Sequence, residues 1–333
     1  MILVTGGAGY IGSHSVVELL SQGNQVLIAD NFVNSSPIVL ENIKKISGKS
    51  TPFIEVDLCD YNKLNNLTKD FDITGVIHFA AFKAVGESVE KPLKYYDNNI
   101  LSLVNVLKLC KERNIENIVF SSSCTVYGSP EKIPVTEFSE VKQAESPYGK
   151  TKVFSEEILK DFHVANPISI CSLRYFNPIG AHTSGLLGDY PDGKPNNLLP
   201  FVTQVAAGIR EKLSVFGNDY NTPDGTCLRD YIHVSDLAKA HVNALRYNSS
   251  NKGKLSVFNL GTGKGISVLE LIKTFEKVNG VKVNYEIAPK RKGDVEAIYA
   301  DCEYAMNELE WKAELTLEDM LSSAWNFQQK MVK

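Results

Sequence analysis

Residues 2–12, with the sequence ILVTGGAGYIG, set the architecture of this 333-residue chain. Three apolar residues predict a short buried strand, and glycines at positions 6, 9 and 12 follow it. The next residues, 13–21, carry apolar side chains at helical spacing. Glycines between a strand and a helix permit a tight turn, close helix packing and the approach of a pyrophosphate to the backbone. The spacing differs from the commoner G-x-G-x-x-G, so an ordinary glycine-rich turn is the open alternative.

An acidic residue ends the next predicted strand, at 25–29. Asp30 lies 18 residues after Gly12, close to the distance at which a carboxylate binds the adenosine ribose hydroxyls of a dinucleotide. A carboxylate there repels a 2′-phosphate, so the pattern favours NAD over NADP. A helix-capping aspartate is the alternative at this position.

Strands and helices alternate along the first half of the chain. Further elements are expected at 52–56, 75–79, 93–113, 117–120 and 168–173. This order predicts an α/β fold, a Rossmann-type doubly wound parallel sheet with helices on both faces. Ligands bind beyond the carboxyl ends of such strands. The residues at those ends are therefore predicted to meet at one edge of the sheet: Asp30, Asp57, Ala80, Ser123 and Tyr175.

Tyr148 and Lys152 carry the candidate chemistry. The dipeptide before Tyr148, Ser-Pro, is a typical helix start, and the residues after it contain no proline, so the pair shares one face of a predicted helix. A free phenol ionises at about pH 10. A neighbouring cation lowers that pKa, and a tyrosine made acidic in this way can act as a base. With 14 tyrosines one chance match is expected, so a surface Tyr–Lys pair is the alternative.

The pattern changes after Tyr175. Residues 176–226 are rich in Gly, Pro, Asn and Asp, with one helical run at 198–209. A long irregular segment in a compact domain is usually functional. The sequence therefore predicts an NAD-binding domain at 1–175, with a returning segment near 230–258, and a smaller α/β substrate-binding domain at 176–333.

Arg229 and Arg291 are candidates to clamp a diphosphate, because a guanidinium matches phosphate oxygens bidentately. A structural salt bridge is the commoner fate of an arginine and is the alternative for both. Residues 261–265 (GTGKG) precede a helical run and could form a second phosphate loop, although a tight turn is favoured. His78 lies inside an apolar strand and is expected to be a core histidine.

Composition excludes several classes of protein. A net charge of −4 provides no basic field, so nucleic acid is not an expected partner. Six cysteines form no C-x-x-C and no zinc spacing, and no His/Asp/Glu cluster has metal spacing. Reduced, buried thiols are typical of a cytoplasmic protein. We expect no metal, no signal peptide and no membrane span.

Several stretches together resemble the UDP-glucose 4-epimerases (UDP-galactose 4-epimerases) of the extended short-chain dehydrogenase/reductase superfamily. The resemblance runs nearly from end to end of the chain. The stretches that carry it are 5–13 (TGGAGYIGS), 78–88 (HFAAFKAVGES), 121–128 (SSSCTVYG), 146–152 (SPYGKTK), 173–180 (LRYFNPIG), 196–198 (NNL), 216–220 (FGNDY) and 229–234 (RDYIHV).

The resemblance implies a role for each of three groups of residues. Ser123, Tyr148 and Lys152 would be catalytic, with Lys152 tuning Tyr148. The group that would bind NAD is Gly6, Gly9, Tyr10, Ile11, Gly12, Asp30, Asn31, Asn34, Ser35, Asp57, Leu58, Phe79, Ala80, Ala81, Lys83, Asn98, Ser121, Tyr148, Lys152 and Tyr175. The group that would hold the UDP-sugar is Ser123, Tyr148, Asn177, Asn197, Leu198, Phe216, Arg229, Arg291, Asp294 and Ile298.

The implied reaction is the reversible epimerisation of UDP-glucose and UDP-galactose at carbon 4 of the hexose. It passes through a transient 4-keto sugar with tightly bound NAD, and it would serve galactose metabolism in a homodimeric protein. Many family members carry tyrosine at the position of Ile298, and others carry a smaller residue. Isoleucine is intermediate in bulk, so additional UDP-N-acetylglucosamine 4-epimerase activity is the alternative.

Two rival functions share part of this pattern. A sugar-nucleotide 4,6-dehydratase would need an Asp-Glu acid/base pair where Cys124 and Thr125 stand. A non-enzymatic NAD-sensing module would not need Ser123, Tyr148 and Lys152 together. The sequence therefore favours the epimerase.

Overall fold

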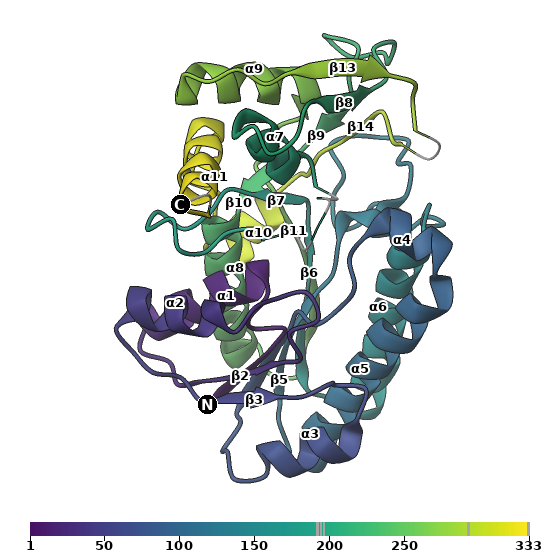
Figure 1. Ribbon diagram of the computed structural model, residues 1–333. Helices are drawn as coiled ribbons and strands as arrows, with labels where there is room; N and C mark the ends of the chain where they lie inside the picture. The colour runs from purple at the N-terminus through teal and green to yellow at the C-terminus, as the bar shows by residue number, and fades with distance from the viewer. Residues whose placement is uncertain (191–192, 194, 196, 292–293, 332–333) are drawn as a thin grey trace.

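A seven-stranded parallel sheet forms the centre of the protein (Figure 1). The computed structural model describes residues 1–190, 193, 195, 197–291 and 294–331, so Asn196 of the family-like stretch 196–198 lies outside the described residues. In spatial order the strands are β3 (Phe53–Glu55), β2 (Val26–Asp30), β1 (Ile2–Thr5), β4 (Gly75–His78), β5 (Asn117–Ser121), β6 (Ser169–Tyr175) and β11 (Leu255–Leu260). All six pairings are parallel. The predicted doubly wound α/β fold is confirmed.

Helices cover both faces of this sheet (Figure 1). One face packs against α1 (Tyr10–Ser21), α2 (Ile38–Ser47) and α8 (Val234–Ser250). The other packs against α3 (Tyr61–Thr68), α5 (Pro92–Glu112) and α6 (Pro147–Ala165). Neighbouring residues of a strand enter opposite cores, as Leu3 and Val4 do in β1. Burial on both faces explains why these strands are continuous apolar runs rather than alternating ones.

The local signals at the start of α6 act as the sequence predicts. Ser146 caps the helix, because its Oγ accepts a hydrogen bond from the Gly149 amide at 3.1 Å. Pro147 occupies the first helical position, where its missing N–H costs nothing. Tyr148 therefore sits in the first turn of α6, next to the carboxyl end of the sheet.

The C-terminal part of the chain builds a second core. Its members come from α7 (Leu198–Ala206), α9 (Val268–Asn279) and α11 (Leu317–Met331), which pack together beside the central sheet (Figure 1). The short elements around them are β7 (Asn177–Ile179), β8 (Leu213–Phe216), β9 (Leu228–Arg229), β10 (Tyr231–His233), β12 (Ile266–Ser267), β13 (Tyr285–Ala288) and β14 (Ala297–Ile298). The helix α4 (Val85–Glu90) packs against α5 and α6, and α10 (Glu303–Glu308) packs against β11. The chain returns to the central layers through α8 and β11. The division into two domains at residue 175 stays a prediction.

The structure adds to or differs from the predictions in three places. The helix expected at 198–209 ends at Ala206, because Gly208 takes a left-handed backbone conformation (φ 73°) that terminates it. In the predicted returning segment, β10 begins only after Asp230, and His233 caps α8 by accepting from the Ser235 amide at 3.0 Å. No helix is expected from the sequence at α2 or α3, although each places an apolar residue in the core, Ile43 in α2 and Leu64 in α3.

Among the described residues, no helix has the length and apolar character needed to cross a bilayer. All six cysteines are free thiols, and Cys110, Cys124, Cys171 and Cys227 are buried.

Candidate active site

A cavity of about 680 Å³ opens where the central strands end. Its wall comes from the glycine turn, from the residues after β2, β3, β4, β5 and β6, and from the first turn of α6. Every residue that the sequence assigns to NAD lies in this wall. Residues from seven different parts of the chain therefore converge, as the parallel sheet requires.

The glycine turn has no room for side chains. A Cβ on Gly12 would lie 2.2 Å from the Gly6 carbonyl oxygen, and one on Gly6 would lie 2.8 Å from the Ala80 nitrogen. Gly6 also has a φ of 68°, which other residues rarely adopt. The turn delivers the chain directly into α1, whose N-terminus faces the cavity as an anion-binding helix end does. These features favour a turn that cradles a dinucleotide pyrophosphate over the alternative, an ordinary glycine-rich surface turn.

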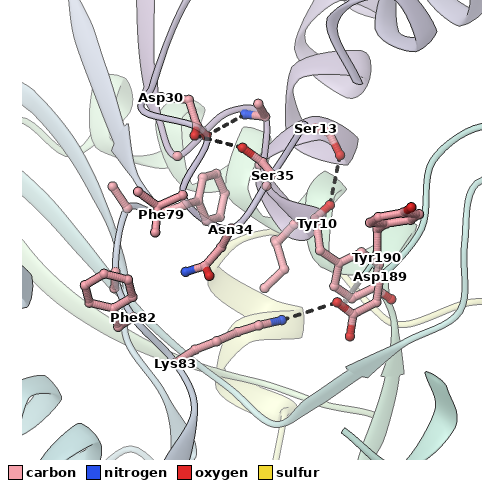
Figure 2. A pocket seen from close by; sticks show the side chains of 18 of the residues that line it. Tyr10, Ser13, Asp30, Asn34, Ser35, Phe79, Phe82, Lys83, Asp189 and Tyr190 are labelled. Carbon is pink, nitrogen blue, oxygen red and sulfur yellow. Dashed lines mark hydrogen bonds and ion pairs between the residues drawn. The ribbon is translucent and has the colours of Figure 1, made fainter. Parts of the chain in front are cut away.

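Asp30 anchors the same turn and borders the cavity (Figure 2). Its carboxylate accepts hydrogen bonds from the Ala8 amide at 3.0 Å, the Phe32 amide at 2.9 Å and the Ser35 hydroxyl at 2.9 Å. The following helix, α2, has Pro37 at its cap position. Asp30 is therefore not a helix cap, and its negative charge stands where a ribose would bind.

Tyr148 and Lys152 share one face of α6 and border the cavity together. The Lys152 ammonium lies 5.9 Å from the centre of the Tyr148 ring. Its nitrogen donates to the Ser121 carbonyl oxygen at 2.6 Å. The Ser121 hydroxyl in turn lies 2.6 Å from the Tyr175 hydroxyl. The ends of β5 and β6 thus hold the lysine in place, and the pair is no surface pair.

In the protein alone the pKa of Tyr148 is not lowered overall, although the nearby ammonium of Lys152 favours the phenolate. Burial raises the pKa of the Tyr148 phenol well above its ordinary value, although the Ser123 hydroxyl opposes this. Burial also lowers the pKa of Lys152 to about 8. The ammonium interacts with the Ser121 carbonyl, and desolvation of the phenol outweighs its effect. A further positive charge near the ring would favour the ionised form of Tyr148.

The residues assigned to the UDP-sugar fall into two places. Tyr148 and Asn197 line the cavity. A separate cluster joins the two arginines through one carboxylate: Asp294 lies 3.5 Å from the Arg229 guanidinium and 3.0 Å from that of Arg291. The Arg291 guanidinium also lies 4.5 Å from the centre of the Phe216 ring. The structure therefore brings both arginines together. Each makes a salt bridge with Asp294, which the sequence analysis gave as the alternative to diphosphate binding.

Ile298 lies between this cluster and the residues that follow β5. It pairs with Arg229 in the register of β14 on β9, and it packs in one apolar cluster with Cys124 and Phe176. Cys124 directly follows Ser123. The residues assigned to the UDP-sugar that are absent from the described cavity wall are Ser123, Asn177, Leu198, Phe216, Arg229, Arg291, Asp294 and Ile298.

The second glycine-rich loop is a tight turn. The amides of Thr262 and Gly263 donate to the carboxylate of Asp230 at 2.7 and 3.0 Å, and the Thr262 hydroxyl does so at 2.7 Å. A Cβ on Gly261 would lie 2.3 Å from the same carboxylate. The protein's own anion occupies the position that a phosphate would take.

His78 is a core residue, as predicted. Its Nδ1 lies 2.8 Å from the Thr5 hydroxyl, and burial lowers its pKa to about 3. Within the part of the chain that the structure describes, no group of three or more His, Cys, Asp or Glu side chains could hold a metal ion.

Sequence reasoning missed Asp189. This carboxylate lies in the cavity, 3.5 Å from the Lys83 ammonium and 2.8 Å from the Asn197 amide nitrogen (Figure 2). It thereby links a residue assigned to NAD with one assigned to the UDP-sugar. Asp189 belongs to the irregular segment after Tyr175, where no periodic pattern distinguishes one acidic residue from another.

Known proteins resemble this chain along its whole length. A family model described as GDP-mannose 4,6 dehydratase matches residues 3–324. The UDP-glucose 4-epimerase of Haemophilus influenzae is 50% identical over 333 residues, covering 100% of this chain and 98% of that protein. The UDP-glucose 4-epimerase of Bacillus subtilis is 51% identical over 332 residues, covering 99% and 97%.

The chain belongs to the UDP-glucose 4-epimerase family. Within this family, a solved UDP-glucose 4-epimerase from Bifidobacterium longum, in complex with NAD+ and UDP, superposes with a TM-score of 0.95. It is 50% identical and covers 99% of this chain and 98% of that one. The resemblance stated from the sequence is confirmed, as is membership of the extended short-chain dehydrogenase/reductase superfamily.

Gly12→Ala is expected to reduce dinucleotide bound by the purified protein about 10- to 100-fold. The added methyl group must displace the Gly6 carbonyl, and such overpacking costs about 1–3 kcal/mol. The measurement is the nicotinamide dinucleotide released when the protein is denatured. Gly86→Ala is the matched control, because a Cβ there meets open space. Equal dinucleotide content in the two variants would contradict the assignment of this turn.

Proposed function

We infer that the protein interconverts UDP-glucose and UDP-galactose by inverting carbon 4 of the hexose, in the service of galactose metabolism. The observation that carries this inference is the position of Tyr148 and Lys152 in the wall of a dinucleotide-sized cavity, beside the strand that leads to Ser123. Membership of the UDP-glucose 4-epimerase family supports it.

NAD is the cofactor that fits this cavity. The glycine cradle would hold the pyrophosphate, and Asp30 would bind the adenosine ribose while repelling a 2′-phosphate. When bound, NAD supplies the hydride acceptor and donor for carbon 4, together with a positive charge beside the phenol. That charge would favour the phenolate of the buried Tyr148, whose pKa is raised in the protein alone.

Tyr148 serves as the base that takes the proton of the 4-hydroxyl and later returns it. Ser123 assists at the same oxygen. Its Oγ accepts from the Thr125 amide at 3.2 Å, which orients the hydroxyl, and its O–H would donate to the 4-oxygen beside Tyr148. Lys152, held on the Ser121 carbonyl, stabilises the phenolate electrostatically.

The diphosphate provides the fixed point for the rest of the reaction. Arg229 and Arg291 would leave Asp294 in part and clamp the diphosphate, while Phe216 lies against Arg291. Between the two hydride transfers the 4-keto sugar turns about its link to the diphosphate and presents its other face. Hydride return to that face inverts the centre.

The two rival functions are less well supported. Cys124 is buried, and burial raises the pKa of its thiol to about 12, so the position that a dehydratase needs for its acid/base pair holds an inert group. A cofactor-sensing module would not need a buried Tyr–Lys pair inside the cavity. Converting UDP-galactose to UDP-glucose without loss of water distinguishes all three.

We propose that the protein is a homodimer assembled through α5 and α6. Several apolar side chains on these neighbouring helices are exposed, with Leu93 at 73% and Phe154 at 48%. Leu101 on α5 is also exposed, and Tyr96 and Phe154 lie side by side with ring centres 6.1 Å apart. The two helices form one outer side of the molecule (Figure 1). A second copy would bury this stripe in a self-complementary contact.

Leu101→Lys combined with Phe154→Lys is expected to give a monomer, because two charges would be buried in the contact. Analytical ultracentrifugation measures the mass in solution. Phe138→Lys is the control, since Phe138 is 86% exposed and lies on neither helix. A wild-type monomer, or a double variant that stays dimeric, would refute this interface.

We place the protein in the cytoplasm. The six free thiols support a reducing compartment.

Tyr148→Phe is expected to reduce turnover about 100- to 10,000-fold, the usual effect of removing a general base. The ring and its packing are retained, so thermal stability and UDP binding should change little. The control is Tyr285→Phe, because this residue lies on the exposed strand β13. If both variants turned over UDP-galactose equally well, Tyr148 would not be the base.

Ile298 is expected to limit turnover of UDP-N-acetylhexosamines. Its branched side chain is buried against Cys124 and Phe176 and cannot rotate away easily. We expect the wild-type protein to prefer UDP-glucose and UDP-galactose strongly. Ile298→Gly should raise the turnover of UDP-N-acetylhexosamines about 10- to 100-fold, and Ile298→Tyr should abolish that turnover. The ratio of rates for the two substrate classes is measured in each variant. If the ratio of rates did not change with the size of residue 298, the steric barrier would have to lie elsewhere in the pocket.

A further inference from the structure

A buried ion pair, Glu156 with Arg174, lies beside the end of β5, where Ser121, Ser122 and Ser123 follow one another. Glu156 and Arg174 are 4% and 3% exposed. The Arg174 Nε donates to one carboxylate oxygen at 2.9 Å and its Nη2 donates to the other at 2.6 Å. Neither residue lines the cavity or belongs to the groups assigned to NAD or to the UDP-sugar. A buried pair is weak evidence for stability, because desolvation offsets the attraction, so its position deserves another explanation.

The pair is hydrogen-bonded to the chain on both sides of Ser123. On one side, the hydroxyl of Ser122 donates to Glu156 at 2.6 Å. On the other side, Arg174 Nη1 donates to the Tyr127 hydroxyl at 3.0 Å, at the end of the short 3-10 turn that follows Ser123. The Tyr127 hydroxyl donates in turn to the Asn259 side chain at 2.6 Å. The backbone that carries Ser123 is therefore held at two points by one pair of charges.

The same pair is attached to the other catalytic elements. Glu156 lies on α6 one turn beyond Lys152, and Lys152 donates to the carbonyl of Ser121. Lys152 thus holds the carbonyl of Ser121, and Glu156 holds the hydroxyl of the next residue, Ser122. Arg174 directly precedes Tyr175, whose hydroxyl meets that of Ser121. Three elements, β5, β6 and α6, converge on one bidentate contact.

We propose that the Glu156–Arg174 pair positions Ser123 relative to Tyr148 and Lys152, acting through the hydroxyls of Ser122 and Tyr127. A proton acceptor and its partners must be held to within a fraction of an ångström, and a misplacement of about 1 Å costs roughly 100-fold in rate. A planar guanidinium locked on a carboxylate is suited to this task, because its geometry is fixed and the surroundings are dry. Glu156 and Arg174 are positioning residues, since they act through others.

The carboxylate has a second effect on the same site. Burial lowers the pKa of Lys152 to about 8, and the negative charge of Glu156 opposes that fall. The other titratable groups around the ammonium are Tyr148 on its own helix, His78 at the end of β4 and Tyr175 at the end of β6. Loss of the Glu156 charge would therefore leave Lys152 cationic over a narrower pH range, ending at a lower pH.

Ser122→Ala is the decisive variant. It disconnects the pair from the strand and leaves both charges paired, so no uncompensated charge is buried. Ser172→Ala is the matched control, because this buried hydroxyl has no hydrogen-bond partner among the residues that the structure describes. Ser172 lies on β6, next to Phe120 of β5 in the strand register. Both changes remove one buried oxygen from the same pair of strands.

The inference rests on the proposed epimerase, so the wild-type protein is assayed first with UDP-galactose. We expect Ser122→Ala to lower kcat about 10-fold with KM within twofold, and Ser172→Ala to keep kcat within twofold. Melting temperature and bound dinucleotide should match in the two variants. Equal kcat values would overturn the positioning role, whereas an inactive wild type would instead overturn the proposed function.

The double variant Glu156→Leu with Arg174→Met tests the charge. Apolar replacement of a buried pair is often tolerated, so the protein should fold. We expect kcat to fall at least as far as in Ser122→Ala and the alkaline limb of its pH profile to move to lower pH, because Lys152 loses its proton earlier. A folded double variant with wild-type kcat and an unmoved pH profile would refute the proposal. If it does not fold, the comparison of Ser122→Ala with Ser172→Ala decides alone.

Discussion

All seven strands of the central sheet run in the same direction, and the site depends on that constraint. Parallel strands end at one edge, so residues far apart in the chain meet there without any dedicated contact between them. Successive residues at a strand end also point to opposite faces. At the ends of β5 and β6 this gives neighbouring residues different surroundings. Ser121 and Tyr175 face the cavity, whereas Ser122 and Arg174 face the support behind it.

Two glycine-rich turns in this protein present backbone amides that could bind an anion, and they differ in what lies against those amides. Each offers backbone amides that favour an anion. The first, at residues 6–12, opens into the cavity, and the second, at 261–263, is filled by Asp230. Asp230 also accepts from the Ala300 amide at 3.1 Å, so it ties the end of the central sheet to the C-terminal part. The first turn is open to the cavity, and the second joins two parts of the fold.

Burial is the largest influence on the pKa values of Tyr148 and Lys152. It raises the pKa of Tyr148 and lowers that of Lys152, so both groups are pushed toward their neutral forms. The protein opposes this with a carbonyl oxygen from Ser121 and a carboxylate from Glu156, each close to the lysine. A positive charge brought by a bound cofactor would also favour the phenolate.

The sequence by itself determined the fold class, the glycine turn and the group of residues around the cavity, because each depends on local order. Strand, turn and helix follow one another within about 20 residues, and parallel strands must share their ends. Family-like stretches added the functional roles that spacing alone left open. Tertiary structure decided the rest. The partners of Asp230, the position of Asp189 and the Glu156–Arg174 pair join segments 8 to 106 residues apart in the chain, and no periodicity marks such pairs. The pKa of Tyr148 also required the fold, since it depends on how much water the surrounding elements exclude.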